Sequence, residues 1–203
     1  MPQSEYESIC MSEEEYLRTE MISDVKREYI DGHVYAMSGA KRNHNLLAGN
    51  IFREFSNHLK NTHCNTYIAD MKVKSGSKNY FYPDVVVECG DATGDEYFTE
   101  SPVIIVEVLS QSTRKNDLTT KFLRYINIPT LKEYVLIEQD VVSIQVFRKS
   151  NDWKADYYCL NDAVTFESIE LTLTVEDIYD RIDNRDMNEF RQEQRGIDLN
   201  DTP

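Results

Sequence analysis

Residues 82–136 read YPDVVVECGDATGDEYFTESPVIIVEVLSQSTRKNDLTTKFLRYINIPTLKEYVL, and this stretch decides the fold. The run from 103 to 109 within it is apolar except for Glu107. Such a run predicts a strand that is buried on both faces of a sheet. A buried carboxylate is costly unless it is paired, protonated or bound to a metal. Glu107 therefore needs a partner, and Asp84 and Lys121 are the obvious candidates.

The rest of the chain predicts helices and strands that alternate around this strand. A helix is expected to start at Ser12, which has the serine and glutamate pattern of a capping box. Further helices are expected over residues 41–60 and 114–127, the second of them ended by Pro129. Strands are expected over residues 26–37 (a hairpin turning at Asp31-Gly32), 66–74, 80–88, 133–138, 141–148 and 153–160, with a loop over 91–101. This order predicts an α/β fold, a mixed central sheet flanked by helices.

Length and composition predict one cytoplasmic domain. Residues 1–182 are expected to form it, and residues 183–203 to form a polar, acidic C-terminal tail. No segment is apolar for long enough to span a membrane, and the acidic N-terminus is unlike a signal peptide. The cysteines, which show no C-x-x-C spacing, argue against a zinc site or a disulfide framework and fit reduced thiols. They are Cys10, Cys64, Cys89 and Cys159.

The formal net charge of -14 argues against a nucleic-acid partner, but its distribution is uneven. Residues 26–80 carry nine bases and four acids, a local charge of +5. On the expected helix 41–60, Arg42, Arg53 and Lys60 lie on the polar face, where they could contact a DNA backbone. The alternative is that these cations simply solvate the outside of a helix and a hairpin.

Asp84 and Glu107 are carboxylates that two neighbouring strands could bring to one end of a sheet. Two carboxylates suit Mg²⁺ or Mn²⁺, and the backbone carbonyl of Val108 would be a further oxygen ligand. On the following helix, the spacing points Lys121 inward, toward the same carboxylates. The alternative leaves Asp84 in a turn, Glu107 half-exposed, and Lys121 on the surface in an i, i+4 pair with Asp117.

Several motifs match a known family, and they span residues from about 12 to about 180. They are Glu28 to Met37 (EYIDGHVYAM), His44, Pro83-Asp84, Pro102 to Ser112 (PVIIVEVLSQS), Thr113, Asp117, Lys121 and Glu133-Tyr134. Together they resemble the PD-(D/E)XK nuclease superfamily, which has a restriction-endonuclease-like fold. More narrowly, the chain resembles the Uma-two family of endonucleases.

The resemblance implies roles for individual residues. It implies metal ligation by Asp84 and Glu107. The superfamily lysine normally lies two residues after the acid, where this chain has Leu109, so the resemblance points to Lys121 on the following helix. Glu28 matches a family glutamate and is either a further acidic ligand or a strand residue paired with a lysine. A histidine at the start of the first long helix also matches; for His44 a structural hydrogen bond is the favoured role.

The function expected from these residues is metal-dependent hydrolysis of DNA phosphodiester bonds by a Mg²⁺ or Mn²⁺ endonuclease. Cutting both strands would most simply need a homodimer. The alternative is a non-catalytic interaction or scaffold protein that keeps the nuclease-like fold, which the overall acidity favours. A small-molecule phosphohydrolase is the weakest candidate because the chain has no glycine-rich phosphate motif.

Overall fold

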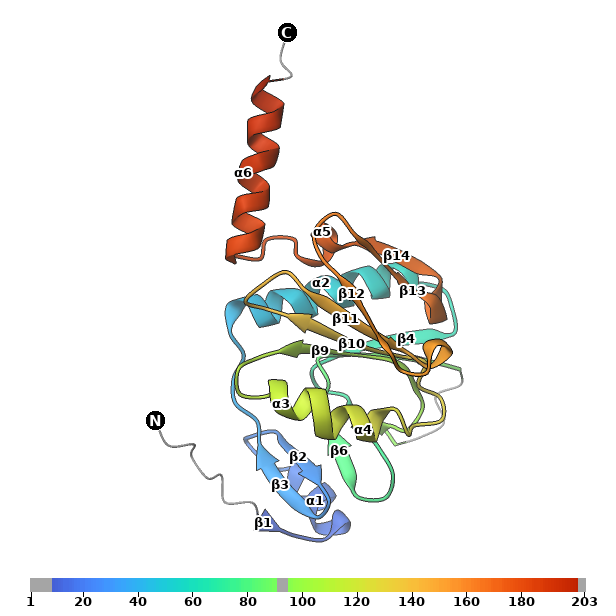
Figure 1. Ribbon diagram of the computed structural model, residues 1–203. Helices are drawn as coiled ribbons and strands as arrows, with labels where there is room; N and C mark the ends of the chain where they lie inside the picture. Colours follow the sequence, from blue (N-terminus) through green and yellow to red (C-terminus); the bar gives the residue numbers. More distant parts are fainter. Residues whose placement is uncertain (1–8, 91–94, 201–203) are drawn as a thin grey trace.

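The computed structural model describes residues 9–90 and 95–200, and its centre is a six-stranded mixed sheet (Figure 1). The strand order is β12-β11-β10-β9-β7-β4; β9 pairs parallel with β10, and the other neighbours are antiparallel. The strands are β4 (Cys64–Ile68), β7 (Val85–Cys89), β9 (Pro102–Leu109), β10 (Glu133–Glu138), β11 (Ile144–Arg148) and β12 (Ala155–Tyr158). Every residue of β9 is buried, which confirms the predicted central strand.

A second six-stranded sheet lies below the first in Figure 1, in the order β1-β3-β2-β6-β5-β8. Its strands are β1 (Ile9–Cys10), β2 (Arg27–Ile30), β3 (His33–Ala36), β5 (Lys72–Lys74), β6 (Asn79–Phe81) and β8 (Phe98–Thr99). Helix α1 (Glu13–Glu20) packs on this sheet through Tyr16, whose ring stacks on Tyr29 at 4.9 Å between centroids. Ser12 accepts a hydrogen bond from the Glu15 amide at 3.2 Å, so the predicted cap is confirmed.

Two predicted strands prove to be broken, and this changes the architecture. The strand expected over 66–74 is divided into β4 and β5, and the one over 80–88 into β6 and β7, with the halves in different sheets. Ala69 has a positive φ of 59°, and Pro83 has no amide donor for a sheet, so neither segment continues as one strand. The Ala69 amide donates to the Asp84 carbonyl at 3.0 Å. Asp84 therefore lies where the chain crosses between the sheets.

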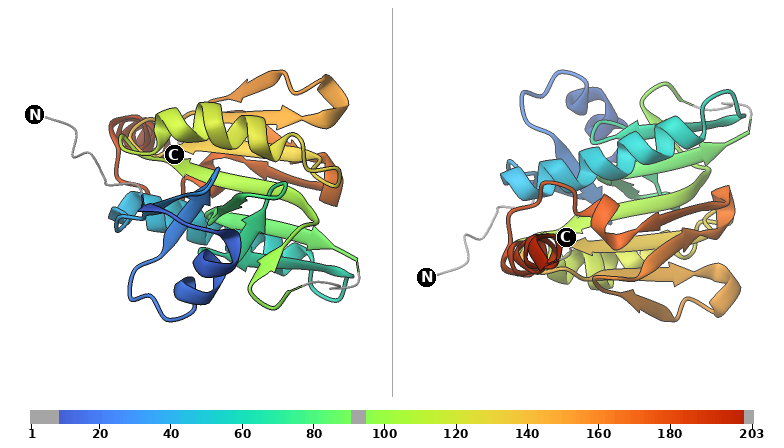
Figure 2. Two further views of the ribbon diagram at one scale, coloured as in Figure 1. Left: turned by 90° about the horizontal axis from the view of Figure 1, so that it is seen from below. Right: turned by 90° about the horizontal axis from the view of Figure 1, so that it is seen from above.

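Helices cover both faces of the central sheet (Figures 1 and 2). On one face lies α2 (Arg42–His58), whose apolar stripe, including Leu47, Ile51 and Phe55, is buried. On the other face lie α3 (Arg114–Asn116) and α4 (Phe122–Tyr125), joined by a π-helical turn over Asp117–Lys121. The sequence predicted a regular helix there. The π turn is the difference, and turns of this kind are frequent at functional sites.

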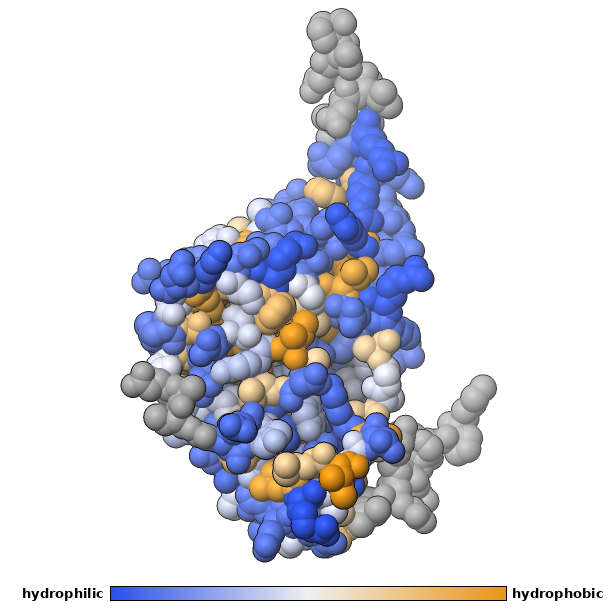
Figure 3. Space-filling model, turned by 180° about the vertical axis from the view of Figure 1, so that it is seen from behind, coloured by the Kyte–Doolittle hydropathy of each residue, from blue (hydrophilic) through white to orange (hydrophobic). Residues whose placement is uncertain are grey.

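The C-terminal part begins beside α2 and completes the cover on this face of the central sheet (Figure 2). It consists of β13 (Ala163–Phe166), β14 (Leu171–Thr174), α5 (Val175–Ile178) and α6 (Arg185–Asn200). Helix α6 projects from the body, and the part of it that is coloured in Figure 3 is mostly hydrophilic on the face in view. Its first turn is anchored, because Met187 is buried and the Asp186 carboxylate accepts from the Val142 amide at 2.7 Å. Among the described residues, no helix has the length and apolar character needed to cross a membrane.

Two smaller expectations also need correction. The predicted loop 91–101 contains the two-residue strand β8, and its residues 91–94 lie outside the described part of the chain. The expectation of four reduced thiols is wrong for two of them, since Cys64 and Cys89 form a disulfide. These two residues face each other across the antiparallel pair β4 and β7, a proximity that their separation of 25 residues does not reveal.

Candidate active site

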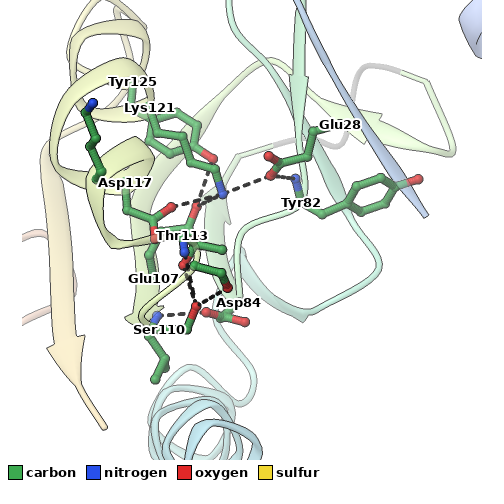
Figure 4. Close-up of polar contacts among 12 residues, drawn as sticks. Glu28, Tyr82, Asp84, Glu107, Ser110, Thr113, Asp117, Lys121 and Tyr125 are labelled. Carbon is green, nitrogen blue, oxygen red and sulfur yellow. Dashed lines mark hydrogen bonds and ion pairs between the residues drawn. The ribbon is translucent and has the colours of Figure 1, made fainter. Parts of the chain in front are cut away.

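Three buried carboxylates surround the ammonium group of Lys121 (Figure 4). Lys121 Nζ lies 2.8 Å from Glu28 Oε1, 3.0 Å from Glu107 Oε1 and 3.3 Å from Asp117 Oδ1. The exposed fraction of the Lys121 and Glu107 side chains is 5%. Lys121, one of the two partners predicted for Glu107, therefore contacts it in the structure. The i, i+4 contact with Asp117 also exists, but it is buried and belongs to this cluster.

The four members of the cluster come from three parts of the fold. Glu107 lies near the end of β9, Glu28 lies in the middle of β2, and Lys121 and Asp117 form the two ends of the π-helical turn. The turn widens the helix by one residue, and both of its ends are buried against the sheet. The central sheet, the second sheet and the covering helix therefore meet at this lysine.

Asp84 lies beside this cluster and is held by different partners. Its Oδ2 accepts a hydrogen bond from the Val108 amide at 2.7 Å, which ties it to the strand that carries Glu107. Its Oδ1 lies 3.1 Å from Nε2 of His44, on the first turn of α2. The side chain of Asp84 is 20% exposed and therefore more accessible than that of Glu107. His44, for which we expected a structural hydrogen bond, contacts a candidate metal ligand.

The pKa values of Asp84, Glu107 and Lys121 are perturbed. Burial raises the pKa of Asp84, although His44 and the Val108 amide lower it in part. Burial likewise raises the pKa of Glu107 well above its usual value, against the opposing effect of Lys121. For Lys121, burial alone would lower the pKa, but the charges of Glu107 and Glu28 outweigh it and raise the pKa well above the usual value. The amine therefore stays protonated.

The donor set fits a hard divalent cation. Four carboxylates (Glu28, Asp84, Glu107 and Asp117) share this region with a single ammonium, so negative charge is in excess. Mg²⁺ and Mn²⁺ prefer carboxylate and carbonyl oxygens, and Mg²⁺ commonly binds through one or two protein carboxylates with several waters. Asp84 and Glu107 supply such a pair. The predicted role of the Val108 carbonyl stays a prediction; the structure gives the contact of its amide.

The predicted DNA-backbone cations do not gather at this site. Arg42 is exposed at the first residue of α2, two positions before His44. Arg53 is paired with Glu54 at 2.8 Å, and Lys60 lies just beyond the other end of the helix. At 1.5 Å per helical residue, Lys60 is about 27 Å from Arg42. Of the three, only Arg42 lies near the carboxylates.

The structure also adds one residue to the site and places another motif residue outside it. The Tyr125 hydroxyl donates to Glu107 Oε1 at 3.1 Å, the same oxygen that contacts Lys121. By helical spacing Tyr125 shares a face with Lys121, but the sequence gives no sign of a polar role for it. Glu133, part of the matching motif, lies elsewhere: it accepts from the Glu167 amide at 3.1 Å and lies 3.5 Å from the Arg148 guanidinium. Its role is structural.

Residues 13–177 match the family model described as "Uma2: Putative restriction endonuclease". The chain belongs to the Uma2 family. Its relatives in Synechocystis sp. include the uncharacterized protein slr1290, which is 36% identical over 174 residues; the match covers 83% of this chain and 91% of that protein. A second relative from the same organism, the uncharacterized protein sll1609, is 33% identical over 142 residues, 68% of this chain and 80% of that protein.

The fold also matches a solved structure. A crystal structure from Anabaena variabilis, described as "a putative nuclease belonging to DUF820", superimposes with a TM-score of 0.66 at 15% identity. The match covers 77% of this chain and 91% of that chain. At this identity the likeness establishes the fold, which is the predicted restriction-endonuclease-like one. The matched Uma2 segment includes every residue of the acidic cluster.

Proposed function

We propose that this Uma2 protein is a metal-dependent DNA endonuclease whose site is formed by Asp84, Glu107 and Lys121. The observation that carries the proposal is a buried lysine within 3.3 Å of three carboxylates, next to a fourth that directly precedes the neighbouring strand β7. A scaffold gains nothing from so much buried charge at one point, since buried ion pairs seldom add net stability. A nuclease needs these charged groups. The scissile phosphate is an anion, so the site requires carboxylates that hold a metal cation and a lysine that offsets the phosphate charge.

The residues divide into ligands and an electrostatic group. Asp84 and Glu107 would hold Mg²⁺ or Mn²⁺, which when bound supplies charge neutralisation at the phosphate and an activated water. The raised pKa of Lys121 makes this residue a cation and not a general base. We therefore assign it to the stabilisation of charge on the pentacovalent transition state. Glu28 and Asp117 keep the ammonium oriented and charged.

His44 acts through Asp84. Its contact with Oδ1, together with the Val108 amide on Oδ2, fixes the rotation of the carboxylate. Outer partners of this kind orient metal ligands, and their loss typically costs 10–100-fold in metal affinity or activity. We therefore place His44 among the positioning residues of the proposed site.

A nicking assay on supercoiled plasmid at low salt tests the proposal. Wild type is compared with Asp84→Ala and Lys121→Ala in Mg²⁺, Mn²⁺ or EDTA. Lys115→Ala is the matched control, since Lys115 is exposed on the same helix. We expect cleavage that requires the metal, is lost in both site variants and persists in the control.

The other outcomes are equally informative. Loss of cleavage in Asp84→Ala alone would leave the metal site standing and remove Lys121 from the mechanism. If wild type does not cut and calorimetry detects no Mn²⁺ binding, the nuclease proposal fails. The overall charge of -14 would then favour the non-catalytic scaffold.

A further inference from the structure

A second group of metal-binding side chains lies at the opposite end of β7 from Asp84. It consists of His63, Cys64 and Cys89, whose ligand atoms all lie within 4.8 Å of one another. Strand β7 runs from the residue after Asp84 to Cys89, so the two places are about 17 Å apart. No other part of the described chain brings three histidine, cysteine or acidic groups this close together.

The backbone holds this group in place. Cys64 and Cys89 are directly paired between β4 and β7, with their Cα atoms 4.0 Å apart. The Gly90 amide donates to the His63 carbonyl at 3.0 Å, and the Cys64 amide donates to the Thr62 hydroxyl at 3.1 Å. The two sulfurs thus project from the same face of adjacent strands, and His63 extends the pair at the sheet edge.

We propose that in the reduced protein His63, Cys64 and Cys89 bind a soft divalent cation of the Zn²⁺ type. Two thiolates and an imidazole are ligands that Zn²⁺ prefers, and they leave a fourth tetrahedral position open to solvent. With Zn–S bonds of about 2.3 Å, tetrahedral geometry places the sulfurs about 3.8 Å apart. Facing cysteines on adjacent strands reach this separation by side-chain rotation once the disulfide is open.

Opening of the disulfide and binding of the cation are two separate steps. A phosphine or dithiol reductant supplies two electrons, and with two protons the disulfide opens to two thiols. Binding of the cation then releases the two thiol protons, because the ligands are thiolates. The disulfide and the metal site are therefore alternative states of one sulfur pair. Either state ties β4, an edge strand of the central sheet, to β7.

The site differs in kind from the one proposed for Mg²⁺. Sulfur and imidazole ligands select borderline-soft cations, whereas carboxylates select hard ones. Because Co²⁺ or Zn²⁺ could also bind at Asp84, the test must report on sulfur ligation itself. Absorption from thiolate-to-cobalt charge transfer does so, since carboxylate and imidazole ligands do not give it.

The experiment reduces the full chain with a phosphine, verifies four thiols per chain by thiol titration, and adds Co²⁺. We expect one equivalent to produce the thiolate charge-transfer band, and one equivalent of Zn²⁺ to displace it. The oxidised protein should give no band. Cys64→Ser and Cys89→Ser should lose it, His63→Ala should weaken Co²⁺ binding at least tenfold, and Asp84→Ala should retain it.

The free cysteines provide the control. Cys10 and Cys159 are exposed and unpaired, so Cys10→Ser and Cys159→Ser should keep the band. A measurement on wild type avoids any effect of substitutions on folding. In the reduced protein, Zn²⁺ should slow the alkylation of Cys64 and Cys89 at least tenfold and leave the alkylation rate of Cys10 unchanged. Absence of the band in fully reduced wild type, or alkylation that Zn²⁺ does not affect, would overturn the proposal.

Discussion

Replacement of Lys121 by methionine should destabilise the protein in a way that depends on pH. The substitution keeps an apolar stem of similar length and removes the one ammonium shared by Glu28, Glu107 and Asp117 at 2.8, 3.0 and 3.3 Å. Breaking a buried ion pair from one side costs about 3–5 kcal/mol. Since three carboxylates lose the same cation, we expect the free energy of unfolding to fall by an amount at the upper end of this range, about 5 kcal/mol at pH 8.

The sign of the pH dependence follows from proton binding. Burial already raises the pKa of Glu107 in the folded state, and removal of Lys121 takes away the charge that opposes this rise, so the folded state binds more protons than the unfolded state. Stability then falls as pH rises through the raised pKa of Glu107, and the loss should be smaller at pH 5.5 than at pH 8. The loss is smaller at low pH because Glu107 takes up a proton there, which removes one uncompensated buried charge.

Urea unfolding of wild type and Lys121→Met at both pH values measures this effect. Lys115→Met, on the exposed surface of the same helix, should change stability by less than about 0.5 kcal/mol. Adding Glu107→Gln to Lys121→Met should restore part of the loss at pH 8. A loss below about 1 kcal/mol, or one that is equal at both pH values, would refute the assignment of Lys121 as the cation of a buried cluster.

Three further predictions follow from the site. Tyr125→Phe removes the hydroxyl that donates to Glu107 and should cost about 2 kcal/mol in urea unfolding; no loss would mean that solvent replaces it. Because burial raises the pKa of Asp84 and Glu107, protons should weaken Mn²⁺ binding already above the usual carboxylate range, and calorimetry between pH 8 and pH 5 should show this decline. Arg42→Ala should weaken DNA binding and reduce its salt slope by about 1, whereas Lys60→Ala should not; equal effects would contradict the placement of DNA near the start of α2.

The sequence predicted those parts of the fold that depend on local patterns. The apolar run around Glu107 predicted the central strand, the cap at Ser12 predicted α1, and Asp31-Gly32 predicted the hairpin turn. The broken strands escaped prediction, since strand-forming residues lie on both sides of Ala69 and of Pro83 while the backbone changes sheet between them. Periodicity records which residues are buried; it carries no information about which sheet buries them.

The candidate site shows the same limit. Asp84, Glu107 and Lys121 could be selected from the sequence because each carries charge within or next to an apolar pattern. The roles of His44 and Tyr125 could not, because they depend on which neighbour each side chain meets after folding. The disulfide between Cys64 and Cys89 is a further case, in which strand pairing joins residues whose spacing matches no motif.

The π-helical turn offers a physical account of a lysine that lies on a helix and not on the strand. In this chain Leu109 occupies the strand position two residues after Glu107, and it is buried in the apolar core on the helix-covered face. A lysine there would have to replace core packing. The widened turn instead brings Asp117 and Lys121 inward together, so that the ammonium arrives with a carboxylate partner of its own. The Lys121 ammonium thus contacts Glu107 from the covering helix, and the apolar core beneath β9 stays closed.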